Sequence, residues 1–529
     1  MASDSPILLE NQWRNPTWRR YLSANRSLVS WLTGFVLFGV FFAWMTQIQF
    51  ASPDLVGTDG YYHIRFAEIM RREGFRPDFP WLPLTILNPR EFYDHHFLYH
   101  VALIPFTLGD LIQGGKWASV LFASLAFTSI YGLLRSQRIP YAGLWALGLL
   151  AVSGAFLYRM SMVRAQSLSL AVLVLGLFLM FGRRYKWLVP LSFLYVWLYD
   201  AFPLMIVAAA VHVFSVWIVE KKLDLRPVLY SGVGVGLGML INPYFPDNVV
   251  FVLRHILPKL TETTSVRVGN EWYPYDTGQL LENSPFALVA FAAGIVGLGL
   301  KERRMDVQTA TVMFLSLIFG LMLFQSRRFI EYFPAFALIF AAFAWRSLLS
   351  PVAGDAAGND KGNGRSWSSL SFTRTLHNWL PALILAALMV PGFIVTSWNA
   401  RESIQASKPS GIYSAAANWL AENTPVRSRV FQTDWDDFTR LFYYNTHNTY
   451  LVGLDPTYLS LYDEHLYEQW VEITQGDVDQ PSEVIAGAFG AEFIFSDLDH
   501  TDFIRQAELD SKIRTVYRDE EAVIFRIVP

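Results

Sequence analysis

Long apolar stretches recur through the first three quarters of the chain and limit what it can fold into. The first stretch runs from about Leu28 to Ile48, which is long enough to cross a bilayer core of roughly 30 Å. It follows no short basic segment and ends in no small-residue cleavage site, so we interpret it as a retained helix and not as a signal peptide. Apolar residues make up 53 % of the 529 residues and charged residues 16 %, whereas soluble domains carry about 25 % charge. The sequence therefore predicts a polytopic α-helical membrane protein.

The composition excludes several classes of function. Lys and Arg together number 42 and Asp and Glu 45, a formal net charge of −3, so there is no basic excess that would bind nucleic acid. The chain contains no cysteine, which excludes disulfides, thiolate metal sites and cysteine nucleophiles. The sequence also shows no glycine-rich phosphate loop and no soluble cytoplasmic domain for a sugar-nucleotide donor.

Clusters of basic residues predict how the chain is oriented in the membrane. They begin at Arg135, Arg183, Lys221, Lys301 and Arg346. Cytoplasmic loops carry an excess of Lys and Arg. All of these clusters fall on the side of the N-terminus if the short apolar segment 97–112 lies along the membrane surface, whereas a span at this segment would turn the later clusters outward. We therefore interpret segment 97–112 as interfacial and place the N-terminus in the cytoplasm.

The predicted architecture is a transmembrane domain followed by a soluble one. Residues 1–27 form a cytoplasmic N-terminus, and residues 28–396 form the transmembrane domain. This domain includes a large first outer loop at 49–114, a long outer loop at 244–284 and a glycine-rich cytoplasmic linker at 349–376. About eleven spans are expected, at roughly 28–48, 115–134, 140–157, 167–182, 187–200, 202–219, 227–243, 285–300, 307–324, 329–348 and 377–396.

Residues 397–529 have the composition of a soluble domain outside the cytoplasm. Segment 412–423 has helical spacing, and the short apolar runs RVFQT, TYLVGL and AEFIFSD are typical of strands. The stretch TVYRDEEAVIFRIV predicts a hairpin that turns across Asp519–Glu521. Alternating strands and helices predict an α/β domain of about 130 residues.

Charged residues collect on the outer side of this predicted topology. A charge at the centre of a bilayer costs about 2.5–3.5 kcal/mol on insertion scales, so charges at helix ends face a cavity or a lipid headgroup. Any one arginine could simply extend to phosphate headgroups, but two arginine pairs and several acids on one side favour a polar cavity. The set comprises Asp59, His63, Arg65, Asp94, His95, His96, Arg159, Arg164, Asp200, Glu271, Arg327 and Arg328.

Three acidic positions each allow a structural and a functional interpretation. Asp59 precedes the predicted helix 61–73, where it is either an N-cap or a carboxylate that binds a metal or accepts a proton. Asp94 is followed by two histidines and so offers metal ligands, although neighbouring side chains point to different sides. Glu271 beside Trp272 is either an interfacial pair or an acid that reaches over a site from the long loop.

These residues together resemble a known family. Asp59 is followed by Tyr-Tyr-His-x-Arg on an interfacial helix, and a long later outer loop carries Glu271. Ser326-Arg327-Arg328-Phe329 leads a late helix, and Trp435-Asp436-Asp437-Phe438 lies near the start of the outer domain. This arrangement resembles the GT-C membrane glycosyltransferases, and among them the catalytic subunit of oligosaccharyltransferase and its bacterial and archaeal relatives. The resemblance covers nearly the whole chain in order and topology.

The resemblance implies a role for each matched residue. Asp59 matches the first-loop Asp that coordinates a metal and orients the acceptor, and Glu271 matches the acid of the mobile outer loop. Arg328, or its neighbour Arg327, matches the arginine that holds the pyrophosphate of the lipid-linked donor. Acceptor binding is implied for Tyr62, His63, Arg65, Trp435, Asp436 and Asp437.

Two features depart from the family pattern. The second outer loop, 158–166, has no acid where the family has an Asp-x-Asp-like motif. Either Asp94 joins Asp59, His95 and Glu271 around a divalent Mn²⁺ or Mg²⁺, or Arg159 and Arg164 neutralise the donor phosphate without a metal. The segment 433–437 lacks the first Trp and the Tyr-Gly of the family's Trp-Trp-Asp motif, so recognition of a peptide sequon is not supported.

The sequence thus predicts a glycosyltransferase in the plasma (inner) membrane. It would move a sugar or glycan from a polyprenyl-linked donor to a protein, glycan or lipid acceptor on the outer face, with inversion implied by the resemblance. Asp59 would take the acceptor proton, and the arginines would neutralise the leaving phosphate. A lipid-linked glycan transporter is the alternative, and it predicts polar residues at mid-helix with inverted repeats. A non-catalytic scaffold or sensor offers no reason for Asp59, Glu271 and Arg328 to share one side.

Overall fold

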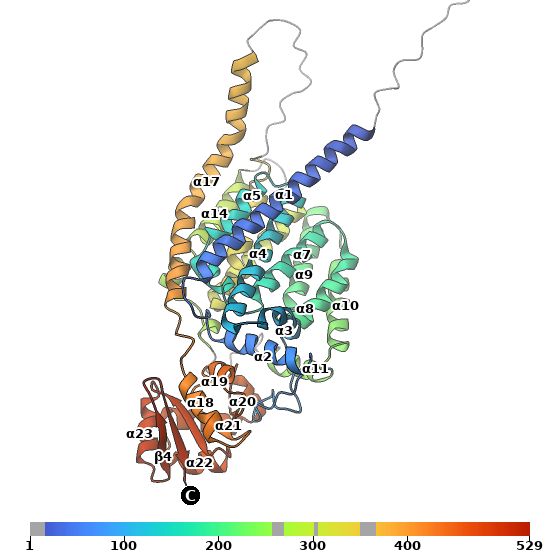
Figure 1. Cartoon of the computed structure of the whole chain (residues 1–529). Coiled ribbons are helices and arrows are strands. Elements are labelled where there is room, and N and C mark those ends of the chain that lie inside the picture. Colours follow the sequence, from blue (N-terminus) through green and yellow to red (C-terminus); the bar gives the residue numbers. More distant parts are fainter. Residues whose placement is uncertain (1–15, 257–268, 301–304, 350–366, 529) are drawn as a thin grey trace, which may run out of the picture.

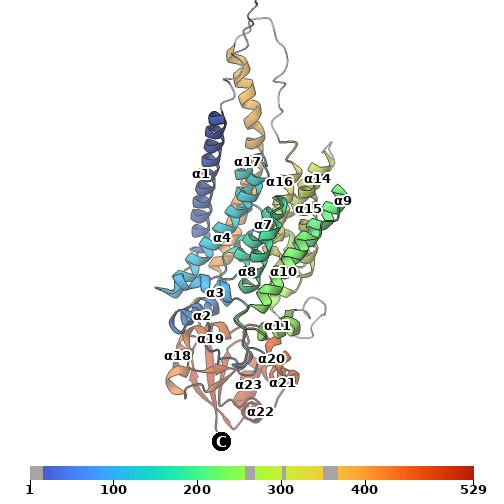
Figure 2. The ribbon, with the colours of Figure 1, turned by 90° about the vertical axis from the view of Figure 1, so that its right-hand side faces the viewer.

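The computed structural model of the chain describes residues 16–256, 269–300, 305–349 and 367–528. Apolar helices form one part of the molecule, and a smaller unit of strands and helices from the C-terminal part of the chain lies at one end of them (Figures 1 and 2). Parts of four predicted segments lie outside the described residues, namely 1–15 of the N-terminus, 257–268 of the long outer loop, the basic cluster 301–304 and 350–366 of the linker.

Five helices of the described residues are long and apolar enough to cross a membrane. They belong to α1 (Pro16–Gln49), α4 (Leu111–Ser136), α9 (Pro203–Glu220), α15 (Val307–Gln325) and α17 (Trp367–Gln405). Two sharply bent pairs raise the number to seven if each pair is one span. They join Ala142–Leu150 to α6 (Gly154–Met160) at 86°, and α13 (Thr277–Asn283) to α14 (Pro285–Gly299) at 82°. The helical architecture is therefore the one predicted, while the number of eleven spans stays a prediction.

Shorter helices complete the bundle. They are α3 (Phe97–Leu103), α5 (Ala142–Leu147), α7 (Gln166–Phe181), α8 (Leu188–Leu198), α10 (Arg226–Leu240) and α16 (Phe333–Ala344). At 1.5 Å per residue, the 11 residues of α8 rise only about 16 Å, roughly half the thickness of a bilayer core. An apolar run of this length therefore does not by itself identify a span.

Two glycines allow α8 and α10 to approach closely. A Cβ atom at Gly234 would lie 2.4 Å from the carbonyl oxygen of Val189, and one at Gly238 would lie 2.9 Å from that of Phe193. The carbonyl oxygen of Gly238 accepts a hydrogen bond of 3.0 Å from the indole of Trp197. Small residues spaced by four positions bring helix backbones together in this way in membrane proteins.

The C-terminal unit is built on a five-stranded sheet of order β2-β1-β3-β5-β4. Strand β1 runs parallel to β2 and β3, whereas β5 runs antiparallel to β3 and β4. The strands are β1 (Arg429–Gln432), β2 (Thr449–Tyr450), β3 (Phe493–Asp497), β4 (Ile513–Arg518) and β5 (Ala522–Ile527). The predicted strands and hairpin are confirmed, and the backbone N–H of Asp519 donates to the carbonyl oxygen of Ala522 at 3.0 Å to close the turn.

Six helices surround this sheet. They are α18 (Ser414–Asn423), α19 (Phe438–Tyr444), α20 (Thr457–Tyr462), α21 (Glu464–Gln475), α22 (Pro481–Gly487) and α23 (Thr501–Leu509). The helix predicted at 412–423 is thus confirmed as α18, beginning two residues later.

The first loop ties the C-terminal unit to the helical bundle. Its helix α2 (Asp59–Glu73) lies against α19 (Figure 1). The carbonyl oxygen of Trp81 accepts a hydrogen bond of 2.8 Å from the backbone N–H of Tyr450 on the edge strand β2, and its indole donates to the carbonyl oxygen of Thr446 at 2.9 Å. This pairing covers an otherwise open sheet edge. The start of α2 is therefore held beside the C-terminal unit.

Candidate active site

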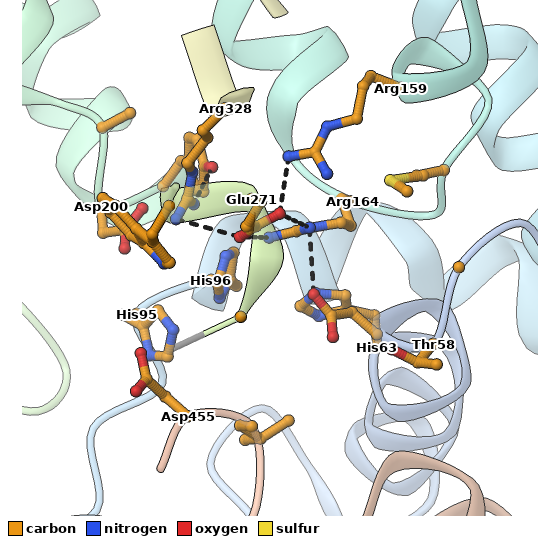
Figure 3. Close-up of a pocket in the computed structure, with 18 of the residues that line it drawn as sticks. Thr58, His63, His95, His96, Arg159, Arg164, Asp200, Glu271, Arg328 and Asp455 are labelled. Carbon is orange, nitrogen blue, oxygen red and sulfur yellow. Dashed lines mark hydrogen bonds and ion pairs between the residues drawn. The ribbon is translucent and has the colours of Figure 1, made fainter. Parts of the chain in front are cut away.

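A cavity of about 790 Å³ is lined by residues of both the helical bundle and the C-terminal unit (Figure 3). Segments that are distant in sequence meet around it, and each contributes charged or aromatic side chains. Among the lining residues are Asp59, Tyr62, His63, His95, His96, Arg159, Arg164, Tyr199, Asp200, Glu271, Trp272, Arg328, Trp435, Asp436 and Asp455. Most of the polar residues predicted to collect on one side of the bundle therefore line one cavity.

Glu271 is surrounded by three arginines of this cavity (Figure 3). Its carboxylate lies 2.8 Å from guanidinium nitrogens of both Arg164 and Arg159, and 3.5 Å from that of Arg328. Burial raises the pKa of Glu271, but the charges of Arg164, Arg159 and Arg328 outweigh burial and hold this pKa well below its ordinary value. Glu271 is thus a permanently ionised acid at neutral pH and a poor proton acceptor.

The Ser-Arg-Arg segment positions the short turn that carries Glu271. The hydroxyl of Ser326 donates to the carbonyl oxygen of Glu271 at 2.9 Å. Arg327 donates through its backbone N–H to the carbonyl oxygen of Tyr273 at 3.0 Å and through Nε to that of Pro274 at 3.1 Å. Arg327 therefore anchors the long loop from outside the cavity.

Its neighbour Arg328 faces the cavity instead. The guanidinium of Arg328 lies 4.7 Å from the ring centroid of Trp272 and also donates to the hydroxyl of Tyr199. A guanidinium stacked on an aromatic ring in this way gains from the attraction of the ring's face for a cation. Of the two arginines left open by the sequence, Arg328 is the one available to a ligand in the cavity.

Arg159 is fixed by a second acid that the sequence argument did not use. Its Nε donates to Oε1 of Glu331 at 3.0 Å, and Glu331 is buried at the end of the turn Arg327–Glu331. The signal for Glu331 was its position at the start of the apolar helix α16 (Phe333–Ala344), because an ionisable residue in such a place needs a partner.

Asp59 is the first residue of α2 and not its N-cap. Oδ2 of Asp59 lies 3.2 Å from Nε of Arg164, so the carboxylate is turned toward the arginines. Thr58 occupies the N-cap position, and its hydroxyl donates to Oδ1 of Asp436 at 2.9 Å. The interpretation of Asp59 as a helix cap is therefore wrong.

Asp436 brings a second carboxylate close to Asp59. Burial and the charge of Asp59 raise the pKa of Asp436 to about 6, although the hydrogen bond from Thr58 lowers it. Neighbouring Asp434 accepts from the backbone N–H of Asp436 at 2.9 Å. Helix α19 begins at Phe438 with Asp437 at its N-cap position, so Asp434, Trp435 and Asp436 lie before this helix.

Histidines of the first loop form a chain that leads away from the cavity. Nδ1 of His63 shares a hydrogen bond of 2.8 Å with Nε2 of His100, and Nδ1 of His100 donates to Oδ2 of Asp94 at 2.8 Å. Burial lowers the pKa of His63 and of His96 well below the ordinary value. His100 was missed because it lies in an apolar stretch, and only the packing of α2 on α3 brings it to His63.

Four predicted site residues lie outside the cavity. Arg327 anchors the long loop and Asp94 binds His100, as described above. Arg65 pairs with Glu68 on the same helix at 2.5 Å, as expected for residues three positions apart. Asp437 is buried within the C-terminal unit.

The predicted metal ligands do not fit a divalent cation in this arrangement. Asp59 and Glu271 both contact the guanidinium of Arg164, and Asp94 is bound by His100. In the described part of the chain, no group of three or more His, Asp or Glu side chains is arranged to hold a metal ion. Asp59 and Glu271 are therefore paired with arginines of the protein itself, and Asp94 is hydrogen-bonded to a histidine.

The fold is similar to that of solved membrane glycosyltransferases. The archaeal oligosaccharyltransferase AglB from Archaeoglobus fulgidus, in complex with an inhibitory peptide and a dolichol-phosphate, aligns with a TM-score of 0.62 and 14 % identity over 90 % of this chain and 71 % of its own. ArnT from Cupriavidus metallidurans, bound to undecaprenyl phosphate, aligns with a TM-score of 0.52 and 17 % identity over 93 % of this chain and 98 % of its own. The arabinofuranosyltransferase AftD from Mycobacteria gives 0.55 and 12 % identity over 93 % of this chain and 40 % of its own.

These similarities concern the fold. No protein family model matches the sequence, and no curated protein is significantly similar to it. The resemblance to GT-C glycosyltransferases that the sequence indicated is confirmed by the fold of these structures.

Proposed function

We propose that this chain is a membrane glycosyltransferase that uses a lipid-linked donor. It transfers a sugar or glycan from a polyprenyl phosphate or diphosphate to an acceptor on the outer face of the membrane, with inversion at the anomeric carbon. The observation that carries this proposal is the meeting of three arginines with Asp59 and Glu271 in one cavity at the end of the helical bundle. Structures of this fold with dolichol-phosphate and with undecaprenyl phosphate support a lipid-linked donor.

The arginines form the donor side of the proposed site. A guanidinium offers a planar fork of N–H donors that matches phosphate oxygens. Arg159 is held by Glu331 and Arg328 by Trp272, so both are fixed before a ligand arrives. Negative charge that develops on the leaving phosphate is neutralised at these groups. Because Glu271 contacts the same arginines, the phosphate shares them with this carboxylate or displaces it.

The acceptor side combines Asp59 with the C-terminal unit. In the proposed transfer, the acceptor heteroatom bonds to the anomeric carbon while the bond from this carbon to the phosphate oxygen breaks. The proton of the acceptor passes to Asp59, and the electron pair leaves with the phosphate. Attack from the face opposite the phosphate inverts the anomeric centre. Trp435 and Asp436, which line the cavity beside Asp59, are suited to hold the acceptor.

We further propose the orientation that the basic clusters predict, with eleven spans, a cytoplasmic N-terminus and the C-terminal unit outside the plasma membrane. The orientation can be tested by cysteine labelling. The sequence contains no cysteine, so each introduced cysteine is the single thiol of the chain. Lys222 and Glu520 are both exposed and lie on opposite predicted sides. A membrane-impermeant thiol reagent applied to intact cells should label the Glu520→Cys variant and spare Lys222→Cys. The reverse labelling would refute the orientation.

Consumption of the donor tests the proposed reaction. Purified protein is incubated with polyprenyl-phosphate and polyprenyl-diphosphate sugars, and the lipid products are separated by mass. Asp59→Asn should abolish consumption of the donor, whereas Asp78→Asn, which changes an exposed acid of the same loop, should leave it intact. Full turnover by Asp59→Asn would remove Asp59 from the reaction. Movement of an intact lipid-linked glycan across vesicle membranes without its consumption would replace the transferase with a transporter.

A further inference from the structure

Arg164 lies between the two acids that the sequence selected as catalytic. Its Nε is 3.2 Å from Oδ2 of Asp59, while Nη1 and Nη2 are 2.8 and 3.2 Å from the two carboxylate oxygens of Glu271. One guanidinium thus bridges a carboxylate of the first loop and a carboxylate of the long later loop (Figure 3). Two acids from separate segments that converge on one positive centre are the arrangement by which proteins hold a divalent cation. Here the positive centre belongs to the chain.

The turn that carries Arg164 is firmly placed against α2. It connects α6 to α7, and the side-chain amide of Gln166 donates to the carbonyl oxygen of Arg159 across it at 2.7 Å. Val163 packs so tightly on the start of α2 that a Cβ at Gly60 would lie 3.0 Å from its Cβ. The guanidinium of Arg164 is therefore held next to Asp59 by the packing of its own turn.

This turn is also the acid-free second outer loop of the sequence. This loop supplies no carboxylate to a metal, and it supplies the guanidinium of Arg164 instead. A divalent ion between Asp59 and Glu271 would have to approach the fixed guanidinium of Arg164 to within contact distance. Like charges at such a separation repel strongly in a partly buried site. Arg159 and Arg328, which also contact Glu271, add to this repulsion.

We infer that Arg164 is a built-in cation that takes the place of a dissociable metal between Asp59 and Glu271. This inference rests on the proposed transferase function for its catalytic meaning. In that reaction Arg164 orients Asp59 toward the acceptor and at the same time holds Glu271 on the donor side. A guanidinium neither dissociates from the chain nor loses its proton at physiological pH, so transfer proceeds without added metal.

The decisive experiment measures Mn²⁺ binding and does not depend on turnover. Purified wild type and Arg164→Ala are titrated with Mn²⁺, and the free ion is followed by electron paramagnetic resonance. We expect that wild type binds no Mn²⁺ through Asp59, so wild type and Asp59→Asn give the same titration. Arg164→Ala should gain one site per chain, and the double variant Arg164→Ala/Asp59→Asn should lose it. Stoichiometric binding by wild type that Asp59→Asn removes would overturn the inference.

Turnover provides the second measurement if the donor is consumed. Wild type treated with a chelator should keep its turnover rate within twofold. The rate of Arg164→Ala should fall about 10²–10³-fold, which is the usual effect of removing one fixed hydrogen-bond donor that stabilises a developing negative charge. Mn²⁺ should restore part of the rate of Arg164→Ala, and Arg164→Lys should retain more of it than Arg164→Ala. A merely structural role would give no recovery with Mn²⁺. Loss of wild-type rate on chelation, with recovery in Mn²⁺, would overturn the inference.

The two measurements separate this inference from the proposed function. If no lipid-linked sugar is consumed, the transferase proposal fails, but the Mn²⁺ titration still decides whether Arg164 excludes a metal. Circular dichroism and size-exclusion chromatography in detergent identify a variant that fails to fold. For such a variant, the comparison of wild type with Asp59→Asn alone remains decisive.

Discussion

Replacing Glu271 by Gln removes one negative charge that three guanidiniums share. The carboxylate lies 2.8 Å from Arg164, 2.8 Å from Arg159 and 3.5 Å from Arg328. Each ion pair of this kind gains about 4 kcal/mol at an effective dielectric constant of about 20, before the cost of taking the ions out of water. Breaking a buried pair by removing one partner costs about 3–5 kcal/mol in net terms. Because the side chain of Glu271 keeps 22 % of its surface exposed, we take the lower end, about 3 kcal/mol.

This free energy corresponds to a measurable change in melting temperature. An unfolding entropy of about 2.1 cal/mol/K per residue gives about 1.1 kcal/mol/K for 529 residues, so the expected decrease in Tm is about 3 °C. Tryptophan fluorescence during a thermal ramp in detergent measures it. Glu282→Gln is the matched control, because Glu282 is exposed and lies in the same long loop. An unchanged Tm for Glu271→Gln would show that the ion pairs contribute nothing net.

The dependence on pH tests the same reasoning from another direction. The pKa of Glu271 is held below its ordinary value, so its contribution to stability is complete above about pH 4.3, the ordinary glutamate value, and is lost as the pH falls through the depressed pKa. The difference in Tm between wild type and Glu271→Gln should therefore stay constant from pH 7 to pH 5. A difference that vanishes in this range would mean that Glu271 titrates near neutrality, and Glu271 would then compete with Asp59 for the role of base.

Three further predictions follow from single contacts. Asp436 has a raised pKa of about 6, so stability is lost as the pH rises from about 4 to about 6, and Asp436→Asn should have a higher Tm than wild type at pH 7.5 but not at pH 4.5. Arg328→Ala should raise the donor KM at least tenfold, whereas Arg327→Ala should change it less than threefold, because only Arg328 faces the cavity. Trp81→Ala should raise the acceptor KM more than the donor KM, because Trp81 docks the C-terminal unit on the first loop.

The fold was predictable where one local pattern determined the structure. Long apolar runs predicted the helices α1, α4, α9 and α15, and short apolar runs predicted the strands β1 and β3. The short helix α8 shows the limit of this reasoning. Its 11 residues are as apolar as those of a span, but they do not reveal the close packing against α10 that Gly234 permits. Such packing is a property of the whole bundle, and a local run of residues does not contain it.

Most residues of the candidate site were predictable from the sequence, but the contacts between them were not. The predicted topology alone placed the acids and arginines on one side, because it assigned the basic clusters to the cytoplasm. It could not distinguish Arg327 from Arg328, since neighbouring residues of a short turn point in different directions and the backbone hydrogen bond to Tyr273 decides which one faces outward. The partners Glu331 and His100 were missed for a similar reason, because each reaches the site through contacts between segments distant in sequence.

Helix α2 connects the helical bundle to the C-terminal unit at the candidate site. Its first residue, Asp59, is pressed against the second outer loop through Gly60 and Val163, which fixes it relative to the helical bundle. The residue before it, Thr58, is bound to Asp436 of the C-terminal unit. A small rotation of the C-terminal unit would therefore move Asp436 relative to Asp59 while leaving the arginines in place. In the proposed reaction, donor binding and acceptor binding would thus belong to different parts of the molecule, and α2 would hold the two parts in a fixed relative position.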